Sequence, residues 1–519
     1  MTSVFEKRLT ALAESGGAEL IGGGQRGIEK ESLRITPAGL ISRRPHPPAL
    51  GSALTNRFIT TDYSEALLEF VTSPVNSSWA AAQFMCDIHQ FTFARLDDEM
   101  LWPLSMPCRL RSEADIPIAD YGTSNVGRMK TIYRRGLGER YGRYMQAIAG
   151  IHFNYSVPDA FWPAWREIVG TAAGAATQSD FYLGLVRNVR RLDWLVLYLF
   201  GASPAVCKSF LKGVPAELDE LDRGTSYGRY ATSLRMSDLG YHNSNQSALV
   251  VSANSLDEYI RDLTAAIARR NPEYAAIGLQ RDGQHIQLNA NQLQIENEYY
   301  STIRPKRVAN SGERPTAALQ RGGIEYVELR ALDLSPFDPV GISQDQQKLL
   351  ELFLLYCLLE TSPPIGADEL DAIQHNNLLV ARRGREPGLR LRRDGGTVER
   401  SEWAVTVLER MQPLAAMLDT AEPGGYGLAL QAAVAAARDP QLTYSARLLA
   451  EQRSTGLSFA DYGLSLAEEY RQYFLGLGDD FNRHLPMLRT EVAESLQRQA
   501  EIEANDTLSL DEYLASYYA

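Results

Sequence analysis

Several acidic side chains and one histidine lie in short runs of sequence that alternate with the period of a β-strand. In residues 26–36, Glu29 and Glu31 share one face. The other members of the set lie in similar strand-like runs or directly beside them. The full set comprises Glu29, Glu31, Asp62, Glu69, His152 and Glu328. Converging carboxylates repel one another unless cations neutralise them, and hard oxygen ligands favour Mg²⁺ or Mn²⁺ over zinc. The pattern therefore favours a divalent-metal site, although for any one glutamate alone a solvent-exposed sheet face is the simpler interpretation.

Arginines occur beside these acids. Arg330 lies two residues after Glu328 on the same expected strand face, and Arg235 lies in the segment TSLRMSDLGY. Phosphoryl transfer requires a metal on the phosphates and an arginine that stabilises the transferred group. The segment IRPKR at 303–307 adds positive charge, but a basic surface turn is an equally good interpretation of it.

A sheet must position these side chains, and hydrophobic periodicity predicts one. Strands are expected at 26–36, 66–72, 150–157 and 324–332, with a long strand or a hairpin at 285–300. Helices are expected at 78–99 (capped by Ser77 or Ser78), 180–200, 255–269 and from the cap Ser343 to about Glu360.

The character of the chain changes after Pro363. Ala- and Leu-rich segments predict helices at 402–418, 427–437, 443–475 and 487–504. We therefore expect a catalytic sheet core with surrounding helices at 1–345 and a mainly helical elaboration at 346–519, packed on the same body.

Composition argues against several classes of protein. The 519 residues include 52 Lys and Arg against 64 Asp and Glu, and the net charge of −12 disfavours binding to nucleic acid or to an anionic membrane. There is no run of about 18 apolar residues, and the first residues do not resemble a signal peptide. The four cysteines form no CxxC pair, so a zinc cage is not supported, and a reducing cytoplasm is the expected compartment.

Two segments that could suggest nucleotide binding are interpreted otherwise. Gly22, Gly24 and Gly27 match G-x-G-x-x-G, but their loop follows a helix and enters a strand, the reverse of the order in dinucleotide-binding folds. The arginine-rich run at 382–393 is interrupted by Pro387, which favours a solvated loop or hairpin over a nucleotide contact. No Walker A sequence occurs, so any use of ATP must proceed without a P-loop.

Many unrelated short motifs occur in the order found in one enzyme family. They are RGIEKESLRI, ITTDYSEALLEFVT, LWPLSMPC, YGTSNVGR, GIHFNYS, LFGASPAVC, ATSLRMSDLGY, LQIENEYYSTIRPKR and GGIEYVELRALDLSPFDPVGI. Over residues 20–345 the chain resembles glutamate–cysteine ligase (γ-glutamylcysteine synthetase) of the proteobacterial type. The resemblance implies an α+β fold with a glutamine-synthetase-like catalytic domain, in which a curved, mainly antiparallel sheet is packed with helices.

The resemblance also implies a two-step reaction. ATP phosphorylates the γ-carboxylate of L-glutamate, and the amine of L-cysteine then attacks the acyl phosphate to give γ-glutamylcysteine, ADP and phosphate. This is the first step of glutathione synthesis. The implied requirements are ATP and Mg²⁺, with Mn²⁺ as an alternative, and the implied partners are small-molecule substrates of a monomeric protein.

The resemblance also implies roles for residues of this chain that match the family's motifs. The implied metal ligands are Glu29, Glu31, Asp62, Glu69, His152 and Glu328. Asp62 and Glu69 could instead steer the incoming ammonium group. Arg330 would stabilise the transferring phosphoryl group, and Arg235 would bind a substrate carboxylate.

The substrate-binding positions implied by the resemblance are mostly aromatic or amide side chains. Those for the cysteine carboxylate are Tyr241 and Tyr300, those for the wall around the cysteine side chain are Tyr133, Leu137 and Gln146, and those for glutamate or nucleotide are Asn154 and Asn297. Tyr63 occupies another pocket position where the best-known relatives have Phe, and its hydroxyl would make the pocket more polar. For any one of these tyrosines alone, a packed core aromatic is the commoner explanation.

Two alternatives remain open at this point. One is a carboxylate–amine ligase of the same fold that uses a different amine acceptor, which a panel of amines would distinguish. The other is a non-catalytic nucleotide- or metal-sensing protein, which need not keep Glu29, Glu31, Glu328 and Arg330 together.

Overall fold

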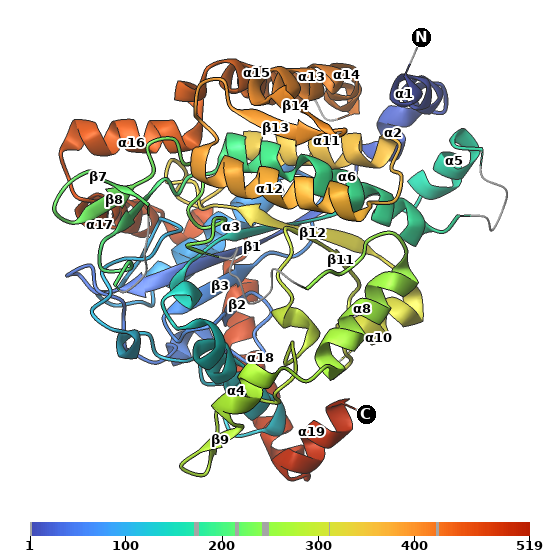
Figure 1. Ribbon diagram of the computed structural model, residues 1–519. Helices are drawn as coiled ribbons and strands as arrows, with labels where there is room; N and C mark the ends of the chain where they lie inside the picture. The colour runs from blue at the N-terminus through green and yellow to red at the C-terminus, as the bar shows by residue number, and fades with distance from the viewer. Residues whose placement is uncertain are drawn as a thin grey trace.

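The computed structural model describes residues 3–170, 176–212, 217–240, 249–310, 312–421 and 425–518. Within these residues, seven strands form the central sheet (Figure 1). They are β1 (Gln25–Ile35), β2 (Ile59–Thr61), β3 (Leu67–Val71), β4 (Met100–Leu101), β5 (Ile151–Ser156), β11 (Ile303–Lys306) and β12 (Tyr326–Leu332). The strand order is β11-β12-β5-β1-β3-β2, with β4 paired to the end of β1, and the pairs are antiparallel. The expected α+β fold with an antiparallel sheet is confirmed.

The pairing register places polar side chains of neighbouring strands side by side. The directly opposed pairs are Glu31 with Glu69, Glu29 with His152, and Asn154 with Glu328. Because side chains alternate with a period of two, all six lie on one face of the sheet.

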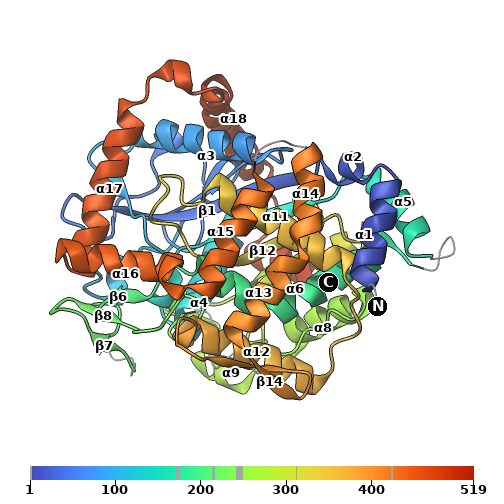
Figure 2. The same cartoon turned by 90° about the horizontal axis from the view of Figure 1, so that it is seen from above.

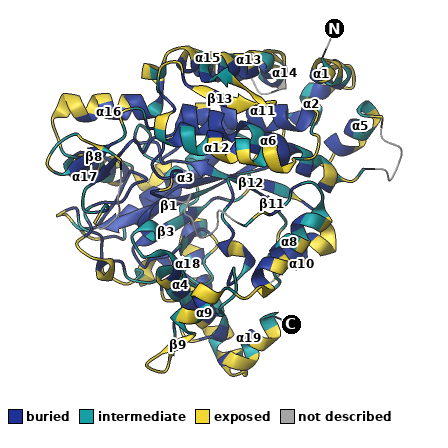
Figure 3. Cartoon of the chain, viewed as in Figure 1, coloured by how far each residue is buried: buried dark blue, intermediate teal, exposed yellow. Residues whose placement is uncertain are grey.

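Helices cover the opposite face of the sheet. They include α3 (Ser78–Phe93), α6 (Gln178–Phe200) and α11 (Gln344–Leu359). α3 packs on β1 and β3, α6 packs on β11 and β12, and α11 contacts both helices. After its first two residues, α11 is buried from Gln346 to Leu359, and Figure 3 shows it as one of the most buried helices. The expected caps are confirmed, since Ser77 begins α3 and a Ser343 capping box begins α11.

Shorter elements surround this core. The remaining helices up to residue 322 are α1 (Val4–Glu14), α2 (Gly17–Ile21), α4 (Asn125–Tyr141), α5 (Phe161–Ile168), α8 (Leu256–Ala268), α9 (Pro272–Ile277) and α10 (Pro315–Gly322). The remaining strands are β6 (Ala205–Cys207), β7 (Asp219–Glu220), β8 (Thr225–Tyr227), β9 (Gln280–Arg281) and β10 (Gln284–His285). Gly22 ends α2 just before β1, so the glycine-rich loop has the expected helix-to-strand order. Among the described helices, none is long and apolar enough to cross a membrane.

The C-terminal part is helical apart from one hairpin. Its elements are α12 (Ala367–Arg383), β13 (Arg390–Arg393), β14 (Gly396–Glu399), α13 (Arg400–Arg410), α14 (Gln412–Ala421), α15 (Tyr426–Arg438), α16 (Tyr444–Thr455), α17 (Phe459–Gly476), α18 (Leu485–Asn505) and α19 (Leu510–Tyr518). α12 packs on α6 and α15 packs on α11, whereas α17 and α18 return to α3 (Figure 2). α19 reaches α4 (Figure 1). The β13–β14 hairpin holds the end of the arginine-rich run, as the hairpin interpretation predicts.

Two expected elements differ from the structure. The segment 285–300 forms no long strand; after β10 it is irregular, with one 3₁₀ turn at Glu296–Glu298. Its amide side chains bond the local backbone instead, because Asn289 Oδ1 accepts from Asn291 N and Gln294 Oε1 accepts from Leu288 N. The helix expected to extend to residue 99 ends at Phe93.

Candidate active site

Three side chains from adjacent strands converge on the polar face of the sheet. They are Glu29 of β1, His152 of β5 and Glu328 of β12. One ligand atom of each lies within 4.8 Å of the other two, and among the described residues this is the one such group of three metal-binding side chains. Nδ1 of His152 is 2.9 Å from Glu29 Oε2 and 3.6 Å from Glu328 Oε1. Two carboxylates and an imidazole at this spacing fit a hard divalent cation such as Mg²⁺ or Mn²⁺.

A second acidic group lies beside the first and comprises Glu31, Asp62 and Glu69. Glu31 Oε1 is 3.8 Å from Nε2 of His152, so the two groups are contiguous. Burial raises the pKa of Glu31 to about 8, with the nearby Asp62 contributing. Burial also raises the pKa of Glu69 well above its usual value, and the neighbouring acids Glu29, Asp62 and Glu31 add to the shift. A bound cation would reverse both shifts by stabilising the ionised carboxylates.

Glu328 has the opposite electrostatic environment. Burial alone would raise its pKa, but Lys306 and Arg330 outweigh burial and hold the pKa well below the ordinary value. Lys306 Nζ is 3.2 Å from Glu328 Oε2, and Arg330 Nη1 donates to Oε1 at 3.0 Å. The burial that disfavours a charged Arg330 is in turn outweighed by Glu328, Tyr300 and Glu29, which raise the Arg330 pKa. Glu328 is therefore ionised and ready to bind a cation.

Arg235 connects this strand to a neighbouring loop. Its guanidinium is buried, donates from Nη2 to the carbonyl of Arg330 at 3.0 Å and lies 3.8 Å from Asp333 Oδ1. A side chain at Gly150 would overlap the Arg235 guanidinium, so the bare glycine backbone makes room for it. Tyr300 lies close by: burial raises the pKa of its hydroxyl, and the positive charges of Arg235 and Arg330 oppose the shift.

The family model described as glutamate–cysteine ligase matches residues 9–380. The chain belongs to this family. A glutamate–cysteine ligase of Azotobacter vinelandii is 50% identical, with the match covering 100% of this chain and 99% of the relative. One of Alcanivorax borkumensis is 47% identical, with the match covering 99% of each chain.

Solved structures agree with the family assignment. The glutamate–cysteine ligase of Francisella tularensis, solved in complex with AMP, superposes with a TM-score of 0.89 at 37% identity, covering 96% of this chain and 97% of that one. A bifunctional glutathione synthetase of Pasteurella multocida superposes with a TM-score of 0.69 at 24% identity, covering 90% of this chain and 55% of that one, and shows a shared fold.

The positions that the ligase family suggests for the amine acceptor lie around α4. Tyr133 and Leu137 are on this helix, Gln146 follows it in the turn Met145–Ala147, and Tyr63 follows β2. The Tyr63 ring is buried, and its hydroxyl points toward α4, where a Cβ at Gly138 would lie 2.5 Å from it. The Tyr63 hydroxyl therefore faces the backbone of α4.

The remaining ligase positions differ in how the structure places them. Asn154 Nδ2 donates to Glu29 Oε1 at 2.9 Å, so Asn154 contacts the carboxylate group directly. Asn297 contributes its backbone carbonyl, which accepts from Arg304 Nη2 at 3.0 Å. Tyr241 lies outside the described residues.

Two further cations contact the site: Lys306, for which the sequence left a functional role and a basic surface turn equally open, and Arg134, which the sequence did not single out. Lys306 comes from the IRPKR segment, and the antiparallel pairing of β11 with β12 is the signal that could have placed it beside Glu328. Arg134 of α4 donates from Nε to the carbonyl of Asp62 and so fixes the strand end that carries this acid. The one feature of the sequence that could have suggested Arg134 is that it follows Tyr133, an implied substrate-binding residue. By contrast, Arg307 bonds the carbonyls of Gly322 and Gly323 near the surface.

Proposed function

We propose that this chain catalyses the ATP-dependent joining of the γ-carboxylate of L-glutamate to the amine of L-cysteine. The products are γ-glutamylcysteine, ADP and phosphate, and the intermediate is γ-glutamyl phosphate. The observation that carries the proposal is the convergence of Glu29, His152 and Glu328 beside Arg330 in a member of the glutamate–cysteine ligase family. A non-catalytic sensor would have no need of this arrangement.

Mg²⁺, or Mn²⁺ in its place, belongs to the same proposal. The residues that would hold it are Glu29, Glu31, Asp62, Glu69, His152 and Glu328. Their fit is supported by the hard donor set and by the raised pKa values of Glu31 and Glu69, which identify an acidic group that a cation would stabilise. When bound, the metal would neutralise negative charge on the triphosphate and on the substrate carboxylate.

Arg330 and Arg235 would act on the substrates directly. In the first step a γ-carboxylate oxygen of glutamate attacks the γ-phosphorus of ATP, and ADP leaves. Arg330 would stabilise the transferring phosphoryl group: its buried Nε has no hydrogen-bond partner among the described residues and can donate to a phosphoryl oxygen. Arg235 would bind a substrate carboxylate and hold it beside Arg330.

In the second step the cysteine nitrogen attacks the γ-carbonyl carbon of the acyl phosphate. A C–N bond forms, the nitrogen loses a proton, and phosphate leaves with the oxygen that belonged to the carboxylate. Tyr241 and Tyr300 would bind the cysteine carboxylate, while the cysteine side chain would lie against Tyr133, Leu137 and Gln146. Asn154 and Asn297 would contact glutamate or nucleotide. Binding the amine beside the acyl phosphate converts a bimolecular attack into an effectively intramolecular one.

An ADP-release assay of the purified protein tests the proposal. With glutamate, Mg²⁺ and ATP present, L-cysteine should support faster ADP release than L-serine, 2-aminobutyrate or other amines. A second candidate is a ligase of the same fold with another acceptor, because Tyr63, buried beside Gly138 of α4, stands where the resemblance implies Phe. Cysteine showing no advantage over the other amines would favour that candidate.

The quaternary state, compartment and domain division are further parts of this proposal. We assign a monomer that works in a reducing cytoplasm, and the four cysteines, all free in the structure, agree with such a compartment. The division into a catalytic body at 1–345 and a helical elaboration at 346–519 is supported by the packing of α12 and α15 on helices rather than on the sheet.

A further inference from the structure

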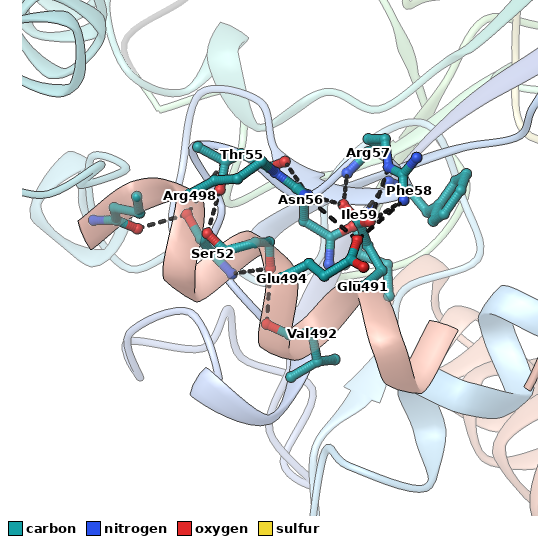
Figure 4. Close-up of polar contacts among 12 residues, drawn as sticks. Ser52, Thr55, Asn56, Arg57, Phe58, Ile59, Glu491, Val492, Glu494 and Arg498 are labelled. Carbon is teal, nitrogen blue, oxygen red and sulfur yellow. Dashed lines mark hydrogen bonds and ion pairs between the residues drawn. The ribbon is translucent and has the colours of Figure 1, made fainter. Parts of the chain in front are cut away.

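Glu491 is a buried carboxylate of α18. It is far in sequence from the acidic residues of the site, yet it binds the loop of residues 51–58, which leads into β2 and the site. Its side chain is 1% exposed. Oε1 accepts from the backbone N of Arg57 at 2.9 Å, and Oε2 accepts from Arg57 Nε at 2.8 Å. Arg498, two helical turns further along α18, also donates to Oε1. Figure 4 shows this carboxylate between the loop and the helix. A buried carboxylate with several charge-assisted partners is strongly specified in position.

The same face of α18 binds the rest of the loop through backbone groups. Thr55 Oγ1 donates to the carbonyl of Ser495 at 2.5 Å, and Arg498 Nη2 donates to the carbonyl of Thr55 at 3.1 Å (Figure 4). The backbone N of Ser52 donates to Ser495 Oγ at 3.1 Å. Gly51 has a φ of +88°, and a Cβ there would lie 2.5 Å from Ser495 Oγ. The loop therefore lies directly against the helix.

A second loop is held by the end of α18 and the residues after it. Glu503 accepts from the backbone N of Thr123 at 2.9 Å, and Asp506 Oδ1 accepts from Asn125 Nδ2 at 2.7 Å. Gly122 has a φ of +86°, and a side chain there would overlap Glu503. Because Asn125 begins α4, the C-terminal segment fixes the start of the helix that carries Tyr133 and Leu137.

Both loops lead to the acceptor side of the site. In the first loop, Asn56 Oδ1 accepts from the backbone N of Phe58 at 2.8 Å and of Ile59 at 3.1 Å, which directs the chain into β2. In the second loop, the hydroxyl of Tyr121 lies 2.8 Å from the carbonyl of Thr61 and 3.0 Å from that of Asp62. The two loops thus meet at the end of β2, where Asp62 and Tyr63 enter the site.

We propose that Glu491 is a positioning residue for the amine acceptor. Through Arg57 and the 51–58 loop, it sets the place of Asp62 and Tyr63 without touching a substrate. This inference rests on the proposed function, because it concerns the acceptor of that reaction. In this proposal Asp62 has its alternative role of steering the incoming ammonium group, and the metal is held by Glu29, His152 and Glu328. These three lie on β1, β5 and β12, strands that this loop does not hold, so the binding of ATP and glutamate does not depend on Glu491.

The substitution Glu491→Gln tests the inference because it keeps the shape of the side chain and removes its charge. The KM for L-cysteine should rise by about fivefold or more, while the KM values for ATP and glutamate and the kcat stay within about twofold. The matched control is Glu494→Gln, since Glu494 is a half-exposed carboxylate on the same helix, 3.6 Å from Arg57 Nη2. This control should leave all the kinetic constants unchanged.

A second variant covers the case in which Glu491→Gln does not fold. Arg57→Gln removes the arginine of this ion pair instead. Because the Arg57 side chain is 60% exposed, the fold is retained, and the substitution should raise the KM for cysteine in the same selective way. Variants that fold but leave the KM for cysteine unchanged, or shift the KM values of all three substrates together, overturn the inference. An unmodified protein without cysteine-dependent ADP release overturns the proposed function as well, so the two failures are distinguishable.

Discussion

At the residue scale, the acids of the site differ in how their charge is compensated. Glu328 lies between Lys306 and Arg330 and is ionised, whereas Glu31 and Glu69 are buried beside other acids and have raised pKa values. A carboxylate that is already ionised can bind a cation without losing a proton, and a carboxylate with a raised pKa must lose one. The two groups therefore make separate, measurable contributions to metal binding.

Glu328→Gln tests the ionised group. The amide keeps the shape but removes the negative charge that the cation needs, so kcat/KM should fall by at least about 100-fold while the far-ultraviolet circular dichroism stays unchanged. Glu325→Gln is the control, because Glu325 is exposed and three residues away on the same segment. Turnover that survives in Glu328→Gln would refute a metal-binding role for this residue.

The pH dependence of metal binding tests the second group. Burial, with Asp62 contributing, raises the pKa of Glu31 to about 8, so in metal-free protein this carboxyl is protonated at pH 7. The affinity for Mn²⁺ should rise between about pH 6.5 and pH 8.5, because the metal competes with the proton. In the unfolded chain the carboxyl has its ordinary pKa, so metal-free protein should lose stability as pH rises toward 8, and Mg²⁺ should restore it. An Mn²⁺ affinity that is flat over this pH range would contradict the assignment.

Much of the residue set could be predicted from sequence, and the reason is the alternation of the strands. Glu29, Glu31, His152 and Glu328 each occupy the same face of a strand, and antiparallel pairing brings those faces together. Arg134 could not be predicted in this way, because its contact with Asp62 depends on how α4 packs against the end of β2.

At the element scale, the start of β5 has to accommodate a guanidinium. The backbone of Gly150 forms two hydrogen bonds with Glu31. Its N donates to the side-chain Oε2 at 2.7 Å, and its carbonyl accepts from the backbone N of Glu31 at 3.0 Å. The guanidinium of Arg235 occupies the space where a side chain of residue 150 would lie. Gly150 thus fixes the position of Glu31 by hydrogen bonds and leaves the space that the Arg235 guanidinium occupies.

Gly150→Ala should displace Arg235 and lower kcat/KM by about tenfold or more, which corresponds to roughly 1.4 kcal/mol of transition-state stabilisation. Gly184→Ala in α6 is the control, because its Cβ would make an ordinary contact, 3.6 Å from Ser362 Cβ. Steady-state kinetics of both variants provide the measurement. Equal activity in the two variants would show that the position of Arg235 does not matter for the reaction.

Sequence periodicity predicts the elements where they are long or regular. The strands of the core and the helices of the C-terminal part lie close to their expected ranges. The segment 285–300 was wrongly expected to be extended, because alternating Leu, Ile, Asn and Gln imitate a strand. In the structure, the amides of Asn289 and Gln294 bond nearby backbone, and Arg140 donates to Gln287 and Glu298 across the segment. Such contacts depend on tertiary packing, which local periodicity does not contain.

At the scale of the whole molecule, helices α11 and α15 are tied to the first strand of the central sheet through one buried carboxylate. Glu351 of α11 pairs with Arg26 of β1 at 3.0 Å and accepts from the hydroxyls of Tyr155 and Tyr426, so β1, β5, α11 and α15 meet at one buried carboxylate. Both Glu351 and Arg26 have side chains 1% exposed. Residues that are far apart in the sequence, in the sheet and in the later helices, therefore depend on one another for stability.

Glu351→Ala should lower the free energy of unfolding by about 3–5 kcal/mol, because it leaves the Arg26 charge buried without its carboxylate. Glu409→Ala, which removes an exposed ion pair with Arg438, should change it by no more than about 1 kcal/mol. Denaturant unfolding of the two variants gives both values. Similar small losses in both would show that the buried pair does not stabilise the packing of α11 on β1.

The most direct test of the proposed reaction follows the oxygen of the glutamate γ-carboxylate. With glutamate labelled by ¹⁸O at that group, and with ATP, Mg²⁺ and L-cysteine, mass spectrometry of the released phosphate reports whether the carboxylate was phosphorylated. Formation of γ-glutamyl phosphate predicts that each phosphate released with γ-glutamylcysteine carries one ¹⁸O atom. Unlabelled phosphate released in step with that product would contradict the acyl-phosphate pathway.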